Sequence, residues 1–76
     1  AEREVDFICE KQNQKLYIQV TYLLASEDTI HREFGVYDTI RDNFPKYVVS
    51  MDEIDMSRNG IKHRNIREFL LSEKWE

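Results

Sequence analysis

Four polar side chains on two neighbouring stretches of the chain have the residue types that could hold a hard metal cation. Glu4 and Asp6 belong to the first stretch, and Gln19 and Thr21 belong to the second. Mg²⁺ prefers oxygen ligands, so paired carboxylates are suitable for it. Metal-assisted hydrolysis also needs a group that orients water and stabilises developing charge. The only lysine expected on the same face is Lys15, near the end of a strand.

A β-hairpin is the element that must bring these residues together. Polar and apolar residues alternate over residues 2–10 and 15–22, which predicts two half-buried strands joined by a turn at residues 11–14. Centring the turn on Gln12 and Asn13 gives the pairs Cys9–Leu16, Phe7–Ile18 and Val5–Val20. We expect these six apolar side chains to share the buried face. Asp6 then lies beside Gln19 and Glu4 beside Thr21 on the other face, and registers shifted by two residues are the alternatives.

A helix is predicted after the hairpin. Ser26 can cap it, and Glu27 and Asp28 suit its positive end. Its apolar stripe comprises Ile30, Phe34, Tyr37 and Ile40. We expect Pro45 to end this helix.

Two further strands and a last helix complete the predicted fold. The stretch 47–51 reads as a buried strand, parallel to its partner after a right-handed crossover. Residues 61–64 predict a short edge strand, and Asn65 with Glu68 resembles a capping box for a helix that holds Ile66, Phe69 and Leu70. The expected fold class is α/β, a small mixed sheet of order β-β-α-β-(β)-α, in a single domain over residues 1–76.

The sequence of the predicted hairpin resembles that of a known family. The stretch Glu4-Val5-Asp6-Phe7, followed by residues 17–22, is similar to the Asp … (Glu/Gln)-x-Lys hairpin of the restriction-endonuclease-like PD-(D/E)xK superfamily. More narrowly, the chain resembles the nuclease-like C-terminal domain of bacterial and archaeal AAA-type ATPases, a domain of unknown function. Residues 47–52, 60–61 and 68–71 resemble that domain too, so the resemblance covers nearly the whole chain.

The resemblance implies a degenerate catalytic site in a truncated restriction-endonuclease-like core. It places the metal-binding Asp at Asp6, the second carboxylate or Gln at Gln19, and the catalytic Lys at Thr21. Thr21 has no cationic head to stabilise phosphorane charge. The implied role is an accessory interaction or structural domain of a parent ATPase, with the ATPase domain of the same parent chain as its partner. The alternatives are a metal-dependent nuclease, in which Glu4 and Asp6 bind Mg²⁺ or Mn²⁺, and a DNA-binding module.

Other polar clusters offer weaker candidates. Lys62, Arg64 and Arg67 form a basic cluster with His63 that could contact phosphates or an acidic partner. The acidic loop Asp52, Glu53 and Asp55 lacks the spacing of an EF-hand. His31 and His63 have no Cys partners for a zinc site.

Composition narrows the function classes. The formal net charge is −4 with a sequence pI near 5.1, which argues against tight, charge-driven binding to nucleic acid. Cys9 is the only cysteine, so no intrachain disulfide can form and a reducing cytoplasm is expected. No apolar run reaches the roughly 20 residues of a membrane span. No Walker-type phosphate loop occurs, so we expect no cofactor here and assign ATP binding to another part of the parent protein.

Overall fold

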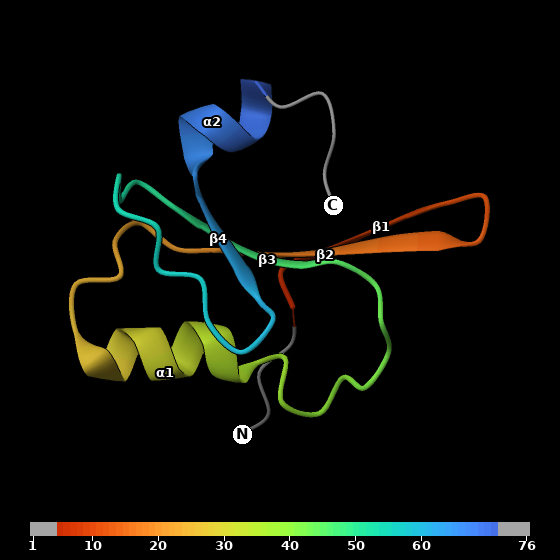
Figure 1. Ribbon diagram of the computed structural model, residues 1–76, viewed down its shortest axis with the longest axis horizontal. Helices are drawn as coiled ribbons and strands as arrows, with labels where there is room; N and C mark the ends of the chain where they lie inside the picture. The colour runs from red at the N-terminus through yellow and green to blue at the C-terminus, as the bar shows by residue number, and fades with distance from the viewer. Residues whose placement is uncertain (1–4, 72–76) are drawn as a thin grey trace.

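The structure, a computed structural model, describes residues 5–71 and consists of a four-stranded mixed sheet with two helices (Figure 1). Along the chain the elements are β1 (Phe7–Lys11), β2 (Gln14–Val20), α1 (Glu27–Gly35), β3 (Lys46–Ser50), β4 (Lys62–Asn65) and α2 (Ile66–Leu71). The strand order is β1-β2-β3-β4; β1 is antiparallel to β2, and β2, β3 and β4 are parallel. The predicted α/β class, element order and parallel crossover are confirmed.

A two-residue turn sets the register of the first hairpin. Gln12 has φ 50° and Asn13 has φ 69°, and positive φ at both central residues is typical of a type I′ turn, whose twist matches that of paired strands. Cys9 pairs with Leu16 and Phe7 with Ile18, as predicted. The ladder ends at Phe7, so the predicted pair Val5–Val20 lies beyond it.

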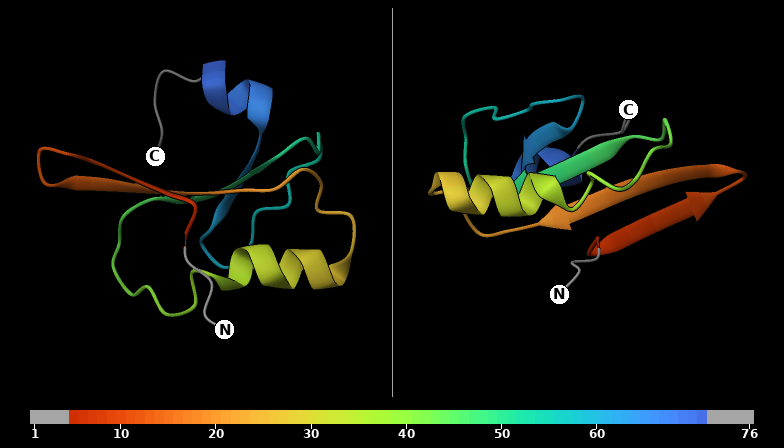
Figure 2. Two further views of the ribbon diagram at one scale, coloured as in Figure 1. Left: turned by 180° about the vertical axis from the view of Figure 1, so that it is seen from behind. Right: turned by 90° about the horizontal axis from the view of Figure 1, so that it is seen from below.

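Each face of the sheet carries its own apolar core. On the α1 face, Tyr17 and Val48 pack with Ile30, Phe34 and neighbouring side chains; on the α2 face, Leu16, Tyr47 and Val49 pack with Phe69. The segment between β3 and β4 lies on the same side as α1, and α2 lies on the opposite side (Figures 1 and 2). Strand β2 is therefore buried on both faces at its centre.

The expectation that one hairpin face holds all the buried apolar residues was wrong. Phe7 is 57% exposed and Val20 41% exposed, and Cys9 is exposed as well, whereas Gln19 on the other face is fully buried. The cause is the placement of the helices, because α2 contacts β3 and β4 while β1 lies at the sheet edge. The β1 part of the hairpin's apolar row, Phe7 and Cys9, therefore has no helix over it, whereas Leu16 of β2 packs with Phe69 of α2.

Helix α1 is shorter than predicted. Ser26 caps it by accepting a hydrogen bond from Thr29 N, as expected, but the helix ends at Gly35 instead of continuing towards Pro45. Gly35 and the β-branched Val36 are weak helix formers. The chain continues in i→i−3 turns, in which Tyr37 N bonds Phe34 O and Ile40 N bonds Tyr37 O. Ile30, Phe34 and Tyr37 are buried as predicted, and Ile40 is half-buried.

Helix α2 begins at the predicted cap. The side-chain oxygen of Asn65 accepts hydrogen bonds from Arg67 N and Glu68 N. Of the apolar residues that this helix was expected to hold, Phe69 is buried in the second core, whereas Leu70 is 69% exposed. Neither helix described over residues 5–71 has the length and apolar character that crossing a membrane requires.

Candidate functional site

The structure places Asp6 and Gln19 side by side and adds Glu33 from α1. The backbone N–H of Asp6 donates to Gln19 Oε1 (2.9 Å), and Gln19 Nε2 donates to Glu33 Oε1 (3.1 Å). In return, the carboxylate of Asp6 accepts a hydrogen bond from Val20 N (3.0 Å). We call these three side chains, Asp6, Gln19 and Glu33, the polar bridge. It ties the start of β1 and the centre of β2 to the buried side of α1.

Burial limits what the polar bridge can do chemically. Gln19 is fully buried and Glu33 is 3% exposed, while Asp6 is exposed. Both ends of the Gln19 amide are engaged by protein groups, so this side chain reaches a metal only by giving up those bonds. Thr21 is half-buried, and its backbone N–H bonds Val49 O. Glu4, predicted as a metal ligand with Asp6, lies outside the described residues.

Glu33 is the member of the site that the sequence analysis missed. Its second oxygen, Oε2, lies 3.3 Å from Arg32 Nε, and the Arg32 side chain is 52% exposed. A signal existed in the helical spacing, because Glu33 is three residues after Ile30 and four before Tyr37. A carboxylate on the buried stripe of a helix needs a partner from the sheet beneath it.

A second polar cluster joins the carboxyl end of β3 to His63, near the start of β4. Ser50 Oγ donates to Asp52 Oδ2 (2.8 Å) and lies 2.7 Å from His63 Nε2. Asp52 Oδ2 also accepts from Leu24 N (2.7 Å), and His63 Nδ1 accepts from Met56 N (3.1 Å). His63 is 2% exposed and Ser50 1%. The cluster therefore connects three segments of the fold beneath the surface.

This cluster has the residue types of a catalytic triad but not its geometry. Met56 N–H donates to Nδ1 and the Ser50 hydroxyl donates to Asp52, so this hydrogen-bond pattern assigns the imidazole proton to Nε2, where it faces Ser50 Oγ. The histidine is thus a donor to the serine, whereas a triad histidine accepts the serine proton and is held by the carboxylate. The cluster fits a structural role.

His63 makes stability depend on pH. The pKa of its imidazole lies below the ordinary value of 6.5, mainly because the ring is buried, and the charge of Arg64 lowers it further. The carboxylates of Asp52 and Asp55 and the carbonyl of Ile54 raise the pKa and offset part of this effect. A depressed folded-state pKa means that the unfolded chain binds the proton more readily, so this contribution to stability is present above about pH 6.5 and is lost as pH falls.

We expect the free energy of unfolding to fall between pH 7 and pH 5, with a slope of at most about 1.4 kcal/mol per pH unit from this one proton. Urea denaturation across that range measures it, and His63→Gln is the matched variant because glutamine does not titrate. An equal slope in that variant contradicts the assignment to His63. Carboxylates with lowered pKa values, such as Asp52, act below about pH 4 and so in a separate window.

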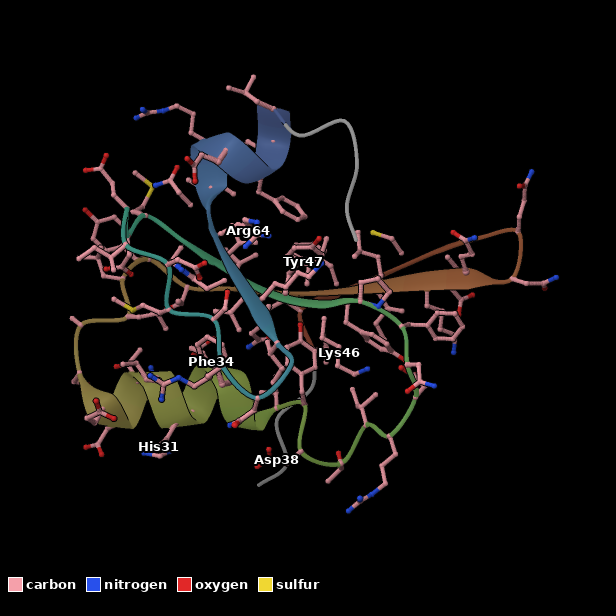
Figure 3. All side chains as sticks on the ribbon, in the orientation of Figure 1. His31, Phe34, Asp38, Lys46, Tyr47 and Arg64 are labelled. Atoms are coloured by element: carbon pink, nitrogen blue, oxygen red, sulfur yellow. The ribbon has the colours of Figure 1, made fainter. Side chains whose placement is uncertain are left out.

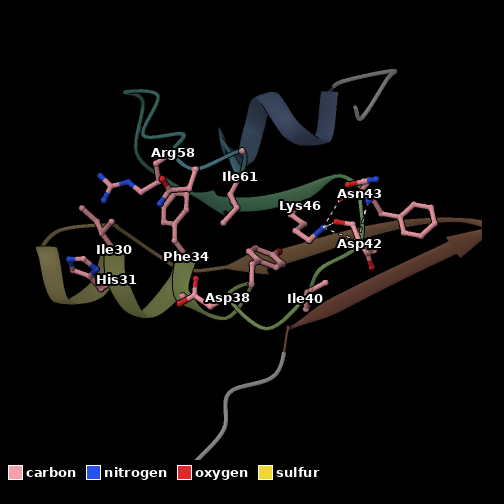
Figure 4. A pocket seen from close by; sticks show the side chains of 15 residues that line it. Ile30, His31, Phe34, Asp38, Ile40, Asp42, Asn43, Lys46, Arg58 and Ile61 are labelled. Atoms are coloured by element: carbon pink, nitrogen blue, oxygen red, sulfur yellow. Dashed lines mark hydrogen bonds and ion pairs between the residues drawn. The ribbon is translucent and has the colours of Figure 1, made fainter.

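An open pocket of about 550 Å³ lies between α1 with the following loop and the turn at residues 58–61 (Figure 4). Lys46 Nζ, at its edge, donates to Asp42 Oδ1 (2.8 Å) and to two backbone carbonyls. The hydrogen bonds that Lys46 and the Tyr17 hydroxyl donate to the Asp42 carboxylate lower the pKa of Asp42 to about 2. The guanidinium of Arg58 lies 5.5 Å from the centre of the Phe34 ring. Of the described candidate residues, His31 lines this pocket, whereas Asp6, Gln19 and Thr21 do not.

The predicted basic cluster divides between packing and solvent. Lys62 Nζ and the Arg64 guanidinium each lie 5.9 Å from the centre of the Tyr47 ring, and both residues are half-buried (Figure 3 shows Arg64 and Tyr47). Arg67 is exposed on α2. His31, on the surface of α1, lies 3.9 Å from Glu27 and far in sequence from His63. In the part of the chain that is described, no three His, Cys, Asp or Glu side chains are placed to hold one metal ion.

Comparison with known proteins does not identify the chain. No family model matches it, and neither the curated proteins nor the solved structures gave a match. The resemblance to a nuclease-like domain of AAA-type ATPases therefore stays a prediction from the sequence.

Proposed function

We propose that this chain is an accessory interaction domain of an AAA-type ATPase, with a nuclease-like site that has lost its catalytic residues. The observation that carries the proposal is the state of Gln19. Where an active nuclease presents a metal ligand, this side chain is fully buried and bonded at both ends, to Asp6 N and to Glu33. The site residues then serve to hold the fold together.

Two other features support a binding role over catalysis. Thr21 supplies no cation at the position where the resembled family keeps its lysine. On the α2 face the hairpin leaves Phe7 57% and Val20 41% exposed, and exposed apolar side chains that lie together mark interaction surfaces. Exposed Cys9 fits a reducing cytoplasm, where thiols stay unpaired.

A metal-dependent nuclease is the second candidate, and exposed Asp6 is what favours it. Its Oδ2 accepts a hydrogen bond from Val20 N, and the exposed carboxylate can still reach a Mg²⁺ or Mn²⁺ ion from solvent. A DNA-binding module is less well supported, since Lys62 and Arg64 pack on Tyr47 and the net charge is −4.

We expect no cleavage of plasmid DNA, single-stranded DNA or RNA by the purified chain with Mg²⁺ or Mn²⁺. The reason is the missing cation at Thr21, since removing one group that stabilises charge in a transition state costs about 10²–10³ in rate. The matched control is Asp6→Ala. Cleavage that disappears in that variant overturns the proposal in favour of the nuclease, whereas cleavage equal in both proteins comes from a contaminant.

The gene upstream of Ala1 should encode a Walker-type ATPase.

A further inference from the structure

The free edge of β1 has apolar residues in its first half, and the charged residues Glu10 and Lys11 follow them. Within residues 5–71, β1 pairs only with β2 and so presents one open edge, which the second view in Figure 2 shows lying clear of both helices. In its first half it carries Phe7, 57% exposed on the α2 face, and Ile8, 54% exposed on the α1 face. Edge strands in native proteins are usually protected by lysines, prolines or bulges. The other edge, β4, is four residues long and carries Lys62 and Arg64.

The backbone of β1 has hydrogen-bonding groups to offer. A two-residue type I′ turn makes its flanking residues, Lys11 and Gln14, a hydrogen-bonded pair, and such pairs alternate along an antiparallel ladder. Cys9 and Phe7 thus use their backbone groups on β2, while the N–H and C=O groups of Ile8 and Glu10 point to the open edge. A further strand can add there without disturbing the existing sheet.

The side chains on the α1 face of this edge set the charge of an added strand. Asp6, Ile8 and Glu10 follow one another on that face, so one apolar residue lies between two acidic ones. Glu10 also forms an ion pair with Lys15 of β2 (3.6 Å), and both side chains reach solvent, so a basic residue of an added strand approaches Glu10 from the open side. Directly opposite residues of antiparallel strands interact, and opposite charges there are favourable. The complementary strand has an apolar residue opposite Ile8 and a basic residue two positions to either side, with apolar residues between them that face the Phe7 side.

The same pattern disfavours pairing with a second copy. Two copies of β1 related by a two-fold axis keep each sheet face continuous, so residues of the same face lie opposite one another. If Ile8 is opposite its own copy, Asp6 lies opposite Glu10 twice, which places like charges together. Shifting the register by two residues places Ile8 opposite Glu10 instead. Both registers are worse than pairing with a basic-flanked strand.

We propose that the open edge of β1 is a docking site for an extended segment of a partner protein that is apolar at its centre and basic at both ends. This proposal rests on the proposed function as an interaction domain and names the chemistry of the partner. Binding occurs by strand addition, with main-chain hydrogen bonds to Ile8 and Glu10 and charge pairing at Asp6 and Glu10.

Two synthetic peptides test the docking site on the intact 76-residue chain by NMR titration. The basic probe is acetyl-Ser-Lys-Val-Ile-Val-Lys-Ser-amide, and the acidic probe has glutamate in place of both lysines. We expect shifts centred on the amides of residues 7–11, with the basic probe binding roughly tenfold tighter than the acidic probe. Equal affinity of the two probes, or no binding of either at about 1 mM, overturns the proposal.

Two variants separate edge pairing from loss of fold. Ile8→Pro removes an outward N–H without removing a β1–β2 hydrogen bond, so it should abolish binding while the amide shifts of β3 and β4 stay unchanged. Glu10→Lys, at an exposed position, should shrink the preference for the basic probe to less than about threefold. Retained binding in Ile8→Pro overturns strand addition. A dimer in sedimentation that Ile8→Pro dissociates also overturns the proposal, because it makes a second copy the occupant. None of these results depends on nuclease activity, which the cleavage assay measures separately.

Discussion

Replacing Phe34 by alanine is expected to destabilise the protein by about 3–5 kcal/mol, the usual cost of removing a buried aromatic side chain. Phe34 is 5% exposed at the centre of the core between α1 and the sheet, with Arg58 over its ring. At about 0.05–0.15 kcal/mol per residue, the whole chain has a stability of about 4–11 kcal/mol. The loss is therefore large enough to unfold much of the population.

Urea denaturation of Phe34→Ala beside Leu70→Ala measures this effect. Leu70 is 69% exposed on α2, so its truncation should change the free energy of unfolding by less than about 0.5 kcal/mol. A loss below about 1 kcal/mol for Phe34→Ala contradicts its place in the core. Equal losses in both variants contradict the described packing of α2.

Local signals in the sequence were enough to predict the element order and the hairpin register. Gln12 and Asn13 can adopt the positive φ of a tight turn, and once the turn is fixed, the pairs Cys9–Leu16 and Phe7–Ile18 follow. Caps at Ser26 and Asn65 are local for the same reason, because each side chain bonds backbone groups two or three residues away. Such features need no knowledge of the tertiary fold.

Burial could not be predicted from the same pattern. Alternation shows that a strand has two different faces, but which face is covered depends on where the helices pack. Here α1 covers the face that carries the polar residue Gln19, and α2 is too short to reach β1. The placement of the helices therefore leaves Phe7 exposed, although its alternation predicted burial. It also buries Gln19, which was expected on the solvent-facing side.

The composition of the candidate site shows the same limit. The adjacency of Asp6 and Gln19 follows from the hairpin register, which is local. Glu33 reaches Gln19 only because α1 crosses over the sheet, a contact between residues 14 positions apart. Gly35 and Val36 are weak helix formers and so indicated that α1 ends at Gly35. The helical spacing of apolar residues continues through Tyr37 and Ile40, however, and predicted a longer helix.

Replacing Gln19 by leucine is expected to destabilise the protein by about 2–3 kcal/mol, although leucine fills most of the same volume. The Glu33 carboxylate loses its 3.1 Å hydrogen bond from Gln19 Nε2, and the loss of a hydrogen bond to a buried charged group costs about 1.5–3 kcal/mol. The Asp6 N–H loses its acceptor too, at a more exposed position.

A double-mutant cycle with Glu33→Leu tests whether the polar bridge acts as one unit. If it does, Gln19→Leu/Glu33→Leu should lose at least about 1.5 kcal/mol less than the sum of the two single variants, because replacing both partners of a buried hydrogen bond by apolar groups removes the desolvation cost together with the bond. Arg32, whose side chain is 52% exposed, can return to water in either variant with Glu33 replaced. Additive losses contradict a structural bridge, and a Gln19→Leu variant as stable as the parent chain leaves Gln19 available for a ligand.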